Sequence, residues 1–399
     1  MTFFRCWFGV AYALVLGLPV QAAPYTPTAN SVVIERLPFR SGDTTARELA
    51  ALRSQVGRAP NDPAPAVELA QRYFDLAMAR GDPRYVGYAD ALVERFPEPL
   101  AAPMLLVRGT LRQYRHDFGA ALDDYARALR EDHDLAGAHA WRGAIFLVTA
   151  DYGSAERECE ALQKLGRAVL SGGCTGLTLA YTGHTEQAYK TLQTALAAAS
   201  NDEHRLWLHT RLGEVSAWAG QPAQAERHFR RALALGRDDG YLLAAWCDFL
   251  LDQGRPAEVT SQLAGWESSD GLLLRLTEAA KLLKMPATPA HQQALADRFA
   301  AAKLRGDTTH RAEEARFHLR LLGDAPGALT LARANYQVQK EPRDARILLE
   351  AALAVQDAGA ARAALDWLHA SAFEDPRLRQ LGQQLTWLAQ ARAPKEARP

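Results

Sequence analysis

The sequence predicts an all-α protein, built as a solenoid of about nine helix–turn–helix pairs and closed by one further helix. The first observation behind this prediction is a pair of amphipathic stretches, over about residues 206–219 and 222–235. Gly220 and Pro222 mark the turn between them, and proline is well tolerated in the first turn of a helix. One such pair cannot bury its apolar stripe alone, so neighbouring pairs must cover it.

The second observation is a constant step between small residues. Gly109 and Gly143 are 34 residues apart, and so are Gly213 and Cys247. A fixed period near this length indicates stacked helix–turn–helix repeats. No segment shows the alternation that a sheet needs, which is the third observation.

The stretch 207–237 also resembles the tetratricopeptide repeat family. The resemblance rests on small, apolar and aromatic residues at that family's spacing: Leu212, Gly213, Ala225, Phe229, Ala232 and Leu233. It implies that Gly213 and Ala225 let two helices approach closely, with Phe229 as an aromatic wedge between them. It covers about residues 63–376, is strongest over 103–263, and implies a right-handed superhelix.

The composition is that of a folded globular chain. Of 399 residues, 48% are hydrophobic and 23% charged, which is too apolar for a disordered chain. Lys+Arg and Asp+Glu both number 46, so no global field recruits nucleic acid or an anionic membrane. The excess of Arg over Lys is interpreted as a consequence of genomic base composition and not of function.

The N-terminus is expected to be a signal peptide, residues 1–22. Arg5 precedes an apolar run over residues 6–18, and small residues follow at Ala22 and Ala23. The alternative is an uncleaved anchor, although the run is short for a membrane span. No later stretch is long and apolar enough to span, so the mature chain is expected to be exported, either periplasmic or secreted.

An extended leader is expected over residues 23–43, followed by a helix over 44–56. The well-matched part of the solenoid is expected over residues 44–266. Its first two pairs are predicted at 67–80 with 85–96 and at 103–116 with 119–130. The following pairs are placed by their small residues, namely Gly143 and Ala155, Gly176 and Ala188, Gly213 and Ala225, and Cys247 and Val259.

Degenerate repeats are expected over residues 267–391. The pairs predicted there are 272–283 with 290–304, 311–322 with 326–338, and 344–356 with 360–371. A capping helix over 378–391 turns four glutamines outward, Gln380, Gln383, Gln384 and Gln390. The tail, residues 392–399, is expected to be disordered.

Three cysteines remain after removal of the signal peptide. Cys159 lies on the second helix of one repeat and Cys174 near the start of the next helix, so a disulfide between them is one interpretation in an exported protein. The other is two separate small apolar fillers. Cys247 is interpreted as a core residue.

The sequence offers no catalytic motif, and we expect neither an enzyme nor a bound cofactor or metal. His204 and His209, or Glu313, Glu314 and His318, have spacings that suit half of a metal site, but a solvated polar face explains them more simply. Residues 171–173, Ser-Gly-Gly, suit either a flexible turn or an anion site before a helix.

The family resemblance implies that the first helix of each repeat lines a concave groove. The groove positions carried over are Leu106, Thr110, Gln113, Tyr114, Leu147, Val148, Leu177, Tyr181, Trp207, Thr210, Glu214, Trp218, Tyr241, Asp248 and Asp252. Their aromatic and acidic character favours a partner that presents an apolar segment with Lys or Arg at one end. Burial between repeats is the alternative for Tyr181 and Trp218.

We therefore expect a non-catalytic scaffold of the cell envelope, similar to exported bacterial tetratricopeptide repeat proteins, that binds a protein or peptide in this groove. One alternative is an accessory subunit of an envelope enzyme or of a transport or assembly complex. Another is a metal- or solute-binding accessory protein.

Overall fold

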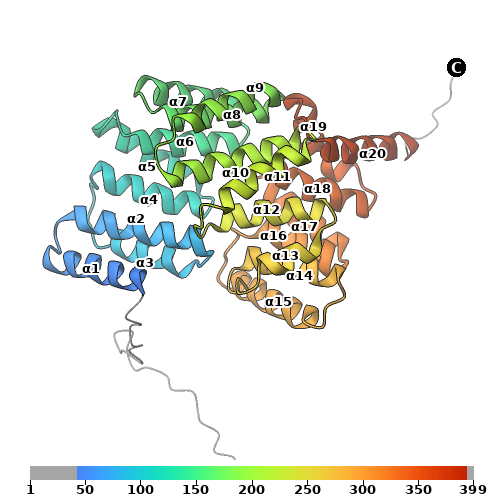
Figure 1. Ribbon diagram of the computed structural model, residues 1–399, viewed down its shortest axis with the longest axis horizontal. Helices are drawn as coiled ribbons and strands as arrows, with labels where there is room; N and C mark the ends of the chain where they lie inside the picture. Colours follow the sequence, from blue (N-terminus) through green and yellow to red (C-terminus); the bar gives the residue numbers. More distant parts are fainter. Residues whose placement is uncertain (1–42, 393–399) are drawn as a thin grey trace, which may run out of the picture. The chain divides into compact units, whose positions relative to one another are not determined.

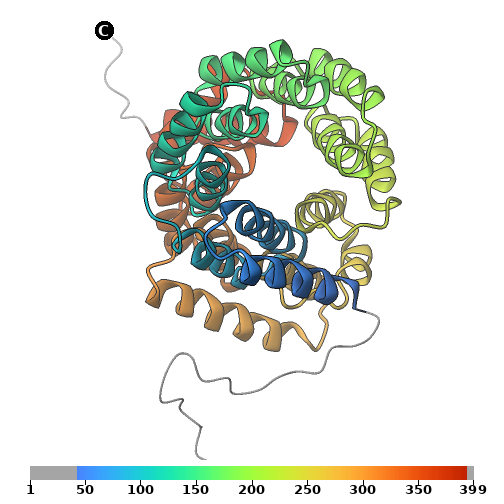
Figure 2. The same ribbon diagram turned by 90° about the vertical axis from the view of Figure 1, so that its left-hand side faces the viewer.

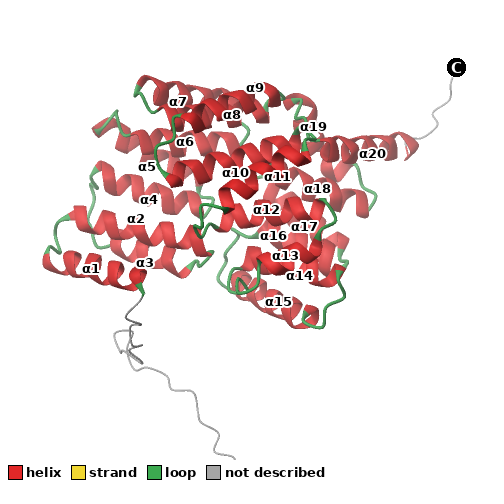
Figure 3. Cartoon of the chain, viewed as in Figure 1, coloured by secondary structure: helices red, strands yellow, loops and turns green. Residues whose placement is uncertain are grey.

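The computed structural model describes residues 43–392, and over this range the chain forms helices and loops without a strand (Figure 3). The predicted signal peptide, nearly all of the predicted leader and residues 393–399 of the predicted tail lie outside the described residues. Helix α1 (Thr44–Arg58) begins in a first compact unit, residues 1–48, and continues into the second, residues 49–399.

The described part of this unit contains nine successive helix pairs and a last helix, α20 (Pro376–Arg392), as the 34-residue step predicts (Figure 1). The pairs are α2 (Pro63–Arg80) with α3 (Arg84–Val93), α4 (Ala102–Tyr114) with α5 (Phe118–Glu131), α6 (Ala136–Val148) with α7 (Tyr152–Lys164), α8 (Ala168–Tyr181) with α9 (Thr185–Ala197), α10 (Asp202–Trp218) with α11 (Pro222–Leu233), α12 (Gly240–Asp252) with α13 (Pro256–Gln262), α14 (Asp270–Leu282) with α15 (Thr288–Leu304), α16 and η1 (Arg311–Arg316 and Phe317–Leu322) with α17 (Ala325–Tyr336), and α18 (Pro342–Ala354) with η2 and α19 (Gly359–Ala361 and Arg362–Ser371).

A glycine facing an aromatic ring sets the distance between the helices of a pair. A Cβ atom added at Gly213 would lie 2.8 Å from the ring of Phe229, and one added at Gly109 would lie 2.5 Å from the ring of Tyr125. Phe229 and Tyr125 are completely buried, and burial of such a ring stabilises the fold by roughly 1.5–3 kcal/mol. The predicted wedge at Phe229 is confirmed, and Tyr125 repeats it three pairs earlier in the chain.

The Ser-Gly-Gly run at residues 171–173 is part of a helix, so both interpretations of it as a turn are wrong. It lies within α8, where a Cβ atom on Gly172 would be 2.8 Å from that of Ala195. The ring of Trp207 lies against Gly173, where a Cβ atom would be only 2.1 Å from it. Because these glycines have no side chain, Ala195 of α9 and Trp207 of α10 pack directly against the backbone of α8.

The predicted helix over 311–322 changes character halfway. After α16, the segment η1 is a π-helix, which ends at Gly323 in the left-handed conformation with φ of 73°. Phe317 and Leu321 of η1 are buried, so the wider turn still faces the core.

Repeats far apart in the sequence also pack on one another. The ring nitrogen of Trp367 in α19 donates a 2.7 Å hydrogen bond to the hydroxyl of Tyr152 in α7. The backbone N–H of Lys340 donates a 2.7 Å bond to the carbonyl of Val148. Figure 2 shows the C-terminal helices, in red, beside the green helices of the middle of the chain, and one hydrophobic cluster includes both. The C-terminal repeats therefore cover a surface of the middle repeats that was expected from the sequence to be exposed.

Candidate binding site between the middle and the C-terminal repeats

A cavity of about 420 Å³ lies where α10 and α12 face α18 and α20. Six of the predicted groove residues line it: Tyr181, Glu214, Trp218, Tyr241, Asp248 and Asp252. Its other side is formed by residues of the C-terminal repeats, among them Glu341, Arg343, Arg346, Asp375 and Arg377. Its lining residues, from Tyr181 to Gln380, come from repeats that are far apart in the sequence.

Aromatic rings form one wall of this cavity. The ring centroid of Trp218 lies 5.7 Å from that of Tyr181 and 5.3 Å from that of Phe373, both at steep angles. Phe373 is completely buried and also meets Tyr181 edge-on at 6.2 Å. Burial raises the pKa of Tyr181, so its phenol stays neutral. Phe373 of the same chain thus packs on two of the aromatic groove positions, Tyr181 and Trp218.

A second group of contacts joins α10 to α12. The hydroxyl of Tyr241 donates a 2.7 Å hydrogen bond to Glu214, and Arg211 donates a 2.9 Å bond to the other carboxylate oxygen of Glu214. The guanidinium of Arg211 also lies 4.3 Å from the centroid of the Tyr241 ring, a favourable cation–π distance. Glu214 is therefore neutralised from within its own repeats.

Asp248 lies between two arginines of later repeats. Arg275 of α14 donates a bond of 2.6 Å to its carboxylate, and Arg316 of α16 donates one of 2.7 Å. Burial alone would raise the pKa of Asp248, but these two guanidinium groups hold it well below its usual range. The carboxylate stays charged and paired.

Asp252, at the end of α12, is paired in the same way. Both terminal nitrogens of Arg346 donate to it at 2.8 Å, and Arg377 of α20 donates a further bond. Arg346 also binds Glu350 at 2.8 Å, as does Arg320. Burial would raise the pKa of Glu350, but the two arginines lower it to about 2. The acidic end of the predicted groove is therefore occupied by the chain's own arginines.

These arginines correct two expectations. A partner need not bring Lys or Arg to Asp248 or Asp252, because Arg275, Arg316, Arg346 and Arg377 already neutralise them. Nor is the excess of arginine only a matter of base composition, since these residues join repeats. The four arginines are visible in the sequence, but the repeats that carry them match the family pattern too weakly to show where each side chain points.

The accessible charge in the cavity belongs to Arg343 and Arg377, whose side chains are 51% and 41% exposed. Arg343 lies 5.8 Å from the Tyr241 ring centroid and binds Glu341 at 2.6 Å. Behind it, Asp344 accepts bonds from the backbone N–H of Glu341 and the side chain of Asn335. Burial, with Glu341 adding to it, raises the pKa of Asp344 to about 7.

The structure places the other nine predicted groove residues away from this cavity. They are buried or half-buried within or between repeats: Leu106, Thr110, Gln113, Tyr114, Leu147, Val148, Leu177, Trp207 and Thr210. Leu106 and Val148 pack around a cluster that Val338 also joins. Two of these nine residues are aromatic: the ring of Tyr114 packs against Phe74, and the ring of Trp207 lies against Gly173 between α8 and α10.

The histidines make contacts within and between helices. His209 lies with its Nδ1 atom 3.1 Å from that of His228, whose other ring nitrogen is 2.9 Å from the hydroxyl of Tyr189. His318 contacts Asp324 at 2.8 Å and not the glutamates before it.

Among residues 43–392 no three His, Cys, Asp or Glu side chains are placed to hold a metal ion. Over the same range no helix is both long enough and apolar enough to cross a bilayer.

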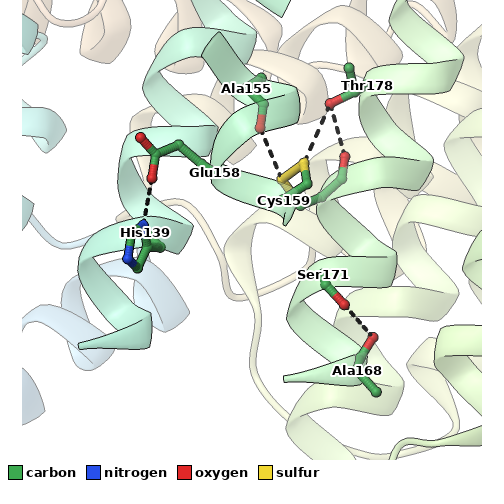
Figure 4. The surroundings of a disulfide bond; sticks show 8 residues. His139, Ala155, Glu158, Cys159, Ala168, Ser171 and Thr178 are labelled. Atoms are coloured by element: carbon green, nitrogen blue, oxygen red, sulfur yellow. Dashed lines mark hydrogen bonds and ion pairs between the residues drawn. A yellow bond between two sulfur atoms is a disulfide. The ribbon is translucent and has the colours of Figure 1, made fainter. Parts of the chain in front are cut away.

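Cys159 and Cys174 form a disulfide between α7 and α8, with their Cα atoms 5.4 Å apart (Figure 4). Cys174 lies in the middle of α8 and not near its start. The neighbouring Glu158 is buried and binds His139 at 2.6 Å and Arg142 at 2.8 Å. Cys247 is free and buried, and burial raises the pKa of its thiol to about 12, as expected for a core residue.

No family model and no curated protein matches the chain. Solved structures that resemble it include a tetratricopeptide repeat protein from Parabacteroides merdae, at 15% identity and a TM-score of 0.39, covering 56% of this chain and 86% of that one. Yeast Tom70 matches at 12% identity and 0.44, covering 87% and 85%. A Rap protein in complex with competence and sporulation factor matches at 13% and 0.41, covering 86% and 99%. The type of repeat is carried by the 34-residue step and the glycine–aromatic packing.

Proposed function

The chain is an all-α solenoid of tetratricopeptide-type helix pairs, and from this premise we propose that it is a non-catalytic scaffold for a protein or peptide partner. The observation that carries the proposal is the cavity between α10, α12, α18 and α20. Its aromatic and charged side chains come from repeats more than a hundred residues apart, and they converge on one cavity.

The partner is proposed to place an apolar side chain beside Trp218 and Tyr241. These rings offer a large contact area at low entropy cost. Arg343 lies next to Tyr241 and is half-exposed, so it can donate hydrogen bonds to a carboxylate or a main-chain carbonyl of the partner. The acidic residues are less suited to binding, because all but Asp375 already hold an arginine side chain and Asp375 accepts the backbone N–H groups of Arg377 and Leu378.

The cell envelope is the proposed location. The order of charged, apolar and small residues over 1–23 supports export. The Cys159–Cys174 disulfide supports an oxidising compartment. Sequencing of the protein recovered from the envelope should begin at Ala23 or Pro24, and retention of Met1 would instead indicate an anchor.

The test is titration of the partner recovered from an envelope extract. Trp218→Ala should weaken its binding by about 2 kcal/mol, roughly 30-fold. Arg343→Gln should weaken it less and reduce its salt dependence. Leu304→Ala, at an exposed position on α15, is the matched control and should bind like the wild type.

If Trp218→Ala folds and binds like the wild type, the partner does not use this cavity. If the recovered partner is an enzyme whose activity depends on this chain, the alternative of an accessory subunit is favoured. A metal- or solute-binding accessory protein is the other alternative, and it would be favoured if a small molecule or metal ion, and no protein, were recovered with the chain.

A further inference from the structure

The outer face of α20 differs from the rest of the surface. Leu378 and Leu385 face inward and are buried, while the four glutamines predicted to point outward are exposed. In the middle of them Trp387 is 70% exposed. A tryptophan so exposed on the last described helix is unusual for a helix that only caps a solenoid.

This face also lacks charge. Residues 380–391 contain no Asp, Glu, Lys or Arg, although 23% of the chain is charged and twelve average residues would hold about three. A soluble surface ordinarily carries about a quarter to a third of charged residues. The absence of charge over three turns of an exposed helix is typical of a surface that another protein covers.

A groove lies directly beside Trp387. It has a volume of about 510 Å³ and runs between α18 and α20. Its apolar lining is Leu353, Leu388 and Trp387 itself, which forms one edge of the groove, and its polar lining is three amides, Gln356, Gln383 and Gln384. The same face therefore carries both a projecting aromatic side chain and an apolar groove next to it.

We infer that this face binds a second copy of the chain, through a two-fold contact in which Trp387 of each copy enters the Leu353–Leu388 groove of the other. A two-fold interface must complement itself, which requires the knob and the groove to lie on one surface. A glutamine amide both donates and accepts hydrogen bonds, so the same residue can pair with its own copy across the axis. A charged residue at that place would meet its own charge.

The chain's own tail is not the occupant. Residues 393–399 read Ala-Pro-Lys-Glu-Ala-Arg-Pro, with no aromatic or branched aliphatic side chain and three charges. Such a segment cannot fill an apolar groove. The inference is independent of the proposed partner cavity, which lies near the other end of α20 around Arg377.

The test is the mass of the purified protein in solution across a concentration series. The wild type should be a dimer, and Trp387→Glu should raise the dimer dissociation constant at least about 30-fold. Leu304→Glu places the same carboxylate at a position that is 90% exposed on α15 and should leave the dimer unchanged. Gln384→Glu, which puts like charges near the axis, should weaken the dimer and should do so less at high salt.

A cysteine introduced near the proposed two-fold axis of the dimer allows a second measurement. Gln384→Cys should give disulfide-linked dimers on oxidation, whereas Leu304→Cys should not. The inference is overturned by a wild type that stays monomeric at its highest soluble concentration, or by a dimer that persists in folded Trp387→Glu. It is also overturned by a mass that grows beyond two copies, or by a dimer that forms only after residues 393–399 are deleted.

Discussion

Arg346 donates two hydrogen bonds of 2.8 Å to the carboxylate of Asp252, across 94 residues of sequence. The contact joins α18 to the end of α12, and Arg377 of α20 reinforces it. Both partners of the pair are largely shielded from water, so the attraction is less screened than at an open surface. The C-terminal repeats are therefore held to the middle of the chain by charge as well as by apolar packing.

Asp252→Asn should loosen this connection. It removes the charge that compensates Arg346 and Arg377, which should cost about 1–3 kcal/mol. Because a repeat array loses cooperativity locally, hydrogen exchange should accelerate first in α18 and α20. Asp366→Asn breaks the surface pair with Arg362 and should cost about 0.5 kcal/mol or less. Equal effects of the two variants would mean that the Asp252 pair stabilises the fold no more than a surface ion pair does.

Phe229→Ala should destabilise the α10–α11 pair by about 3–5 kcal/mol, because it empties the space above Gly213. Gly213→Ala should also destabilise it, since the new Cβ atom would lie 2.8 Å from the ring. The double variant Gly213→Ala with Phe229→Leu should recover part of that loss. Thermal unfolding and hydrogen exchange of α10 and α11 measure all three, and strictly additive losses would contradict a direct contact.

Reduction of the Cys159–Cys174 disulfide should lower the unfolding temperature. Closing a loop of 15 residues stabilises a fold by about 3 kcal/mol through the entropy of the unfolded chain. A variant with Cys159→Ala and Cys174→Ala should unfold at the lower temperature with or without reductant. Cys247→Ala should keep the response to reductant, because Cys247 takes no part in the bond. Absence of a linked peptide in the non-reduced digest would contradict this prediction.

The contribution of His228 to stability should fall as the pH drops from about 6.5 to 4. Burial, with His209 adding to it, lowers the pKa of His228 to about 4. Between these two pKa values the unfolded chain binds a proton at His228 that the folded chain does not bind. This difference lowers the free energy of unfolding by up to about 3 kcal/mol once the pH is below the folded-state pKa. His228→Gln should flatten this part of the stability profile, whereas His369→Gln, at an exposed position, should not.

An NMR titration of the histidine ring protons gives an independent check. The His228 signal should shift near pH 4, and a shift near pH 6.5 would contradict burial as the cause. The effect should be separable from the loss of ion pairs such as Glu350, whose pKa of about 2 places its titration at lower pH.

The sequence by itself determined the helices and the way they pair. Period, punctuation and small residues are local properties, so nine pairs with a last helix followed from them, and the resemblance to the tetratricopeptide repeat matched Gly213 with Phe229. Tertiary structure decided which surfaces stay open. The acidic residues Asp248 and Asp252 were visible in the sequence, but their arginines come from repeats up to 125 residues later. A small change in the angle between successive repeats accumulates along a solenoid. The local sequence pattern therefore does not predict which distant repeats come into contact.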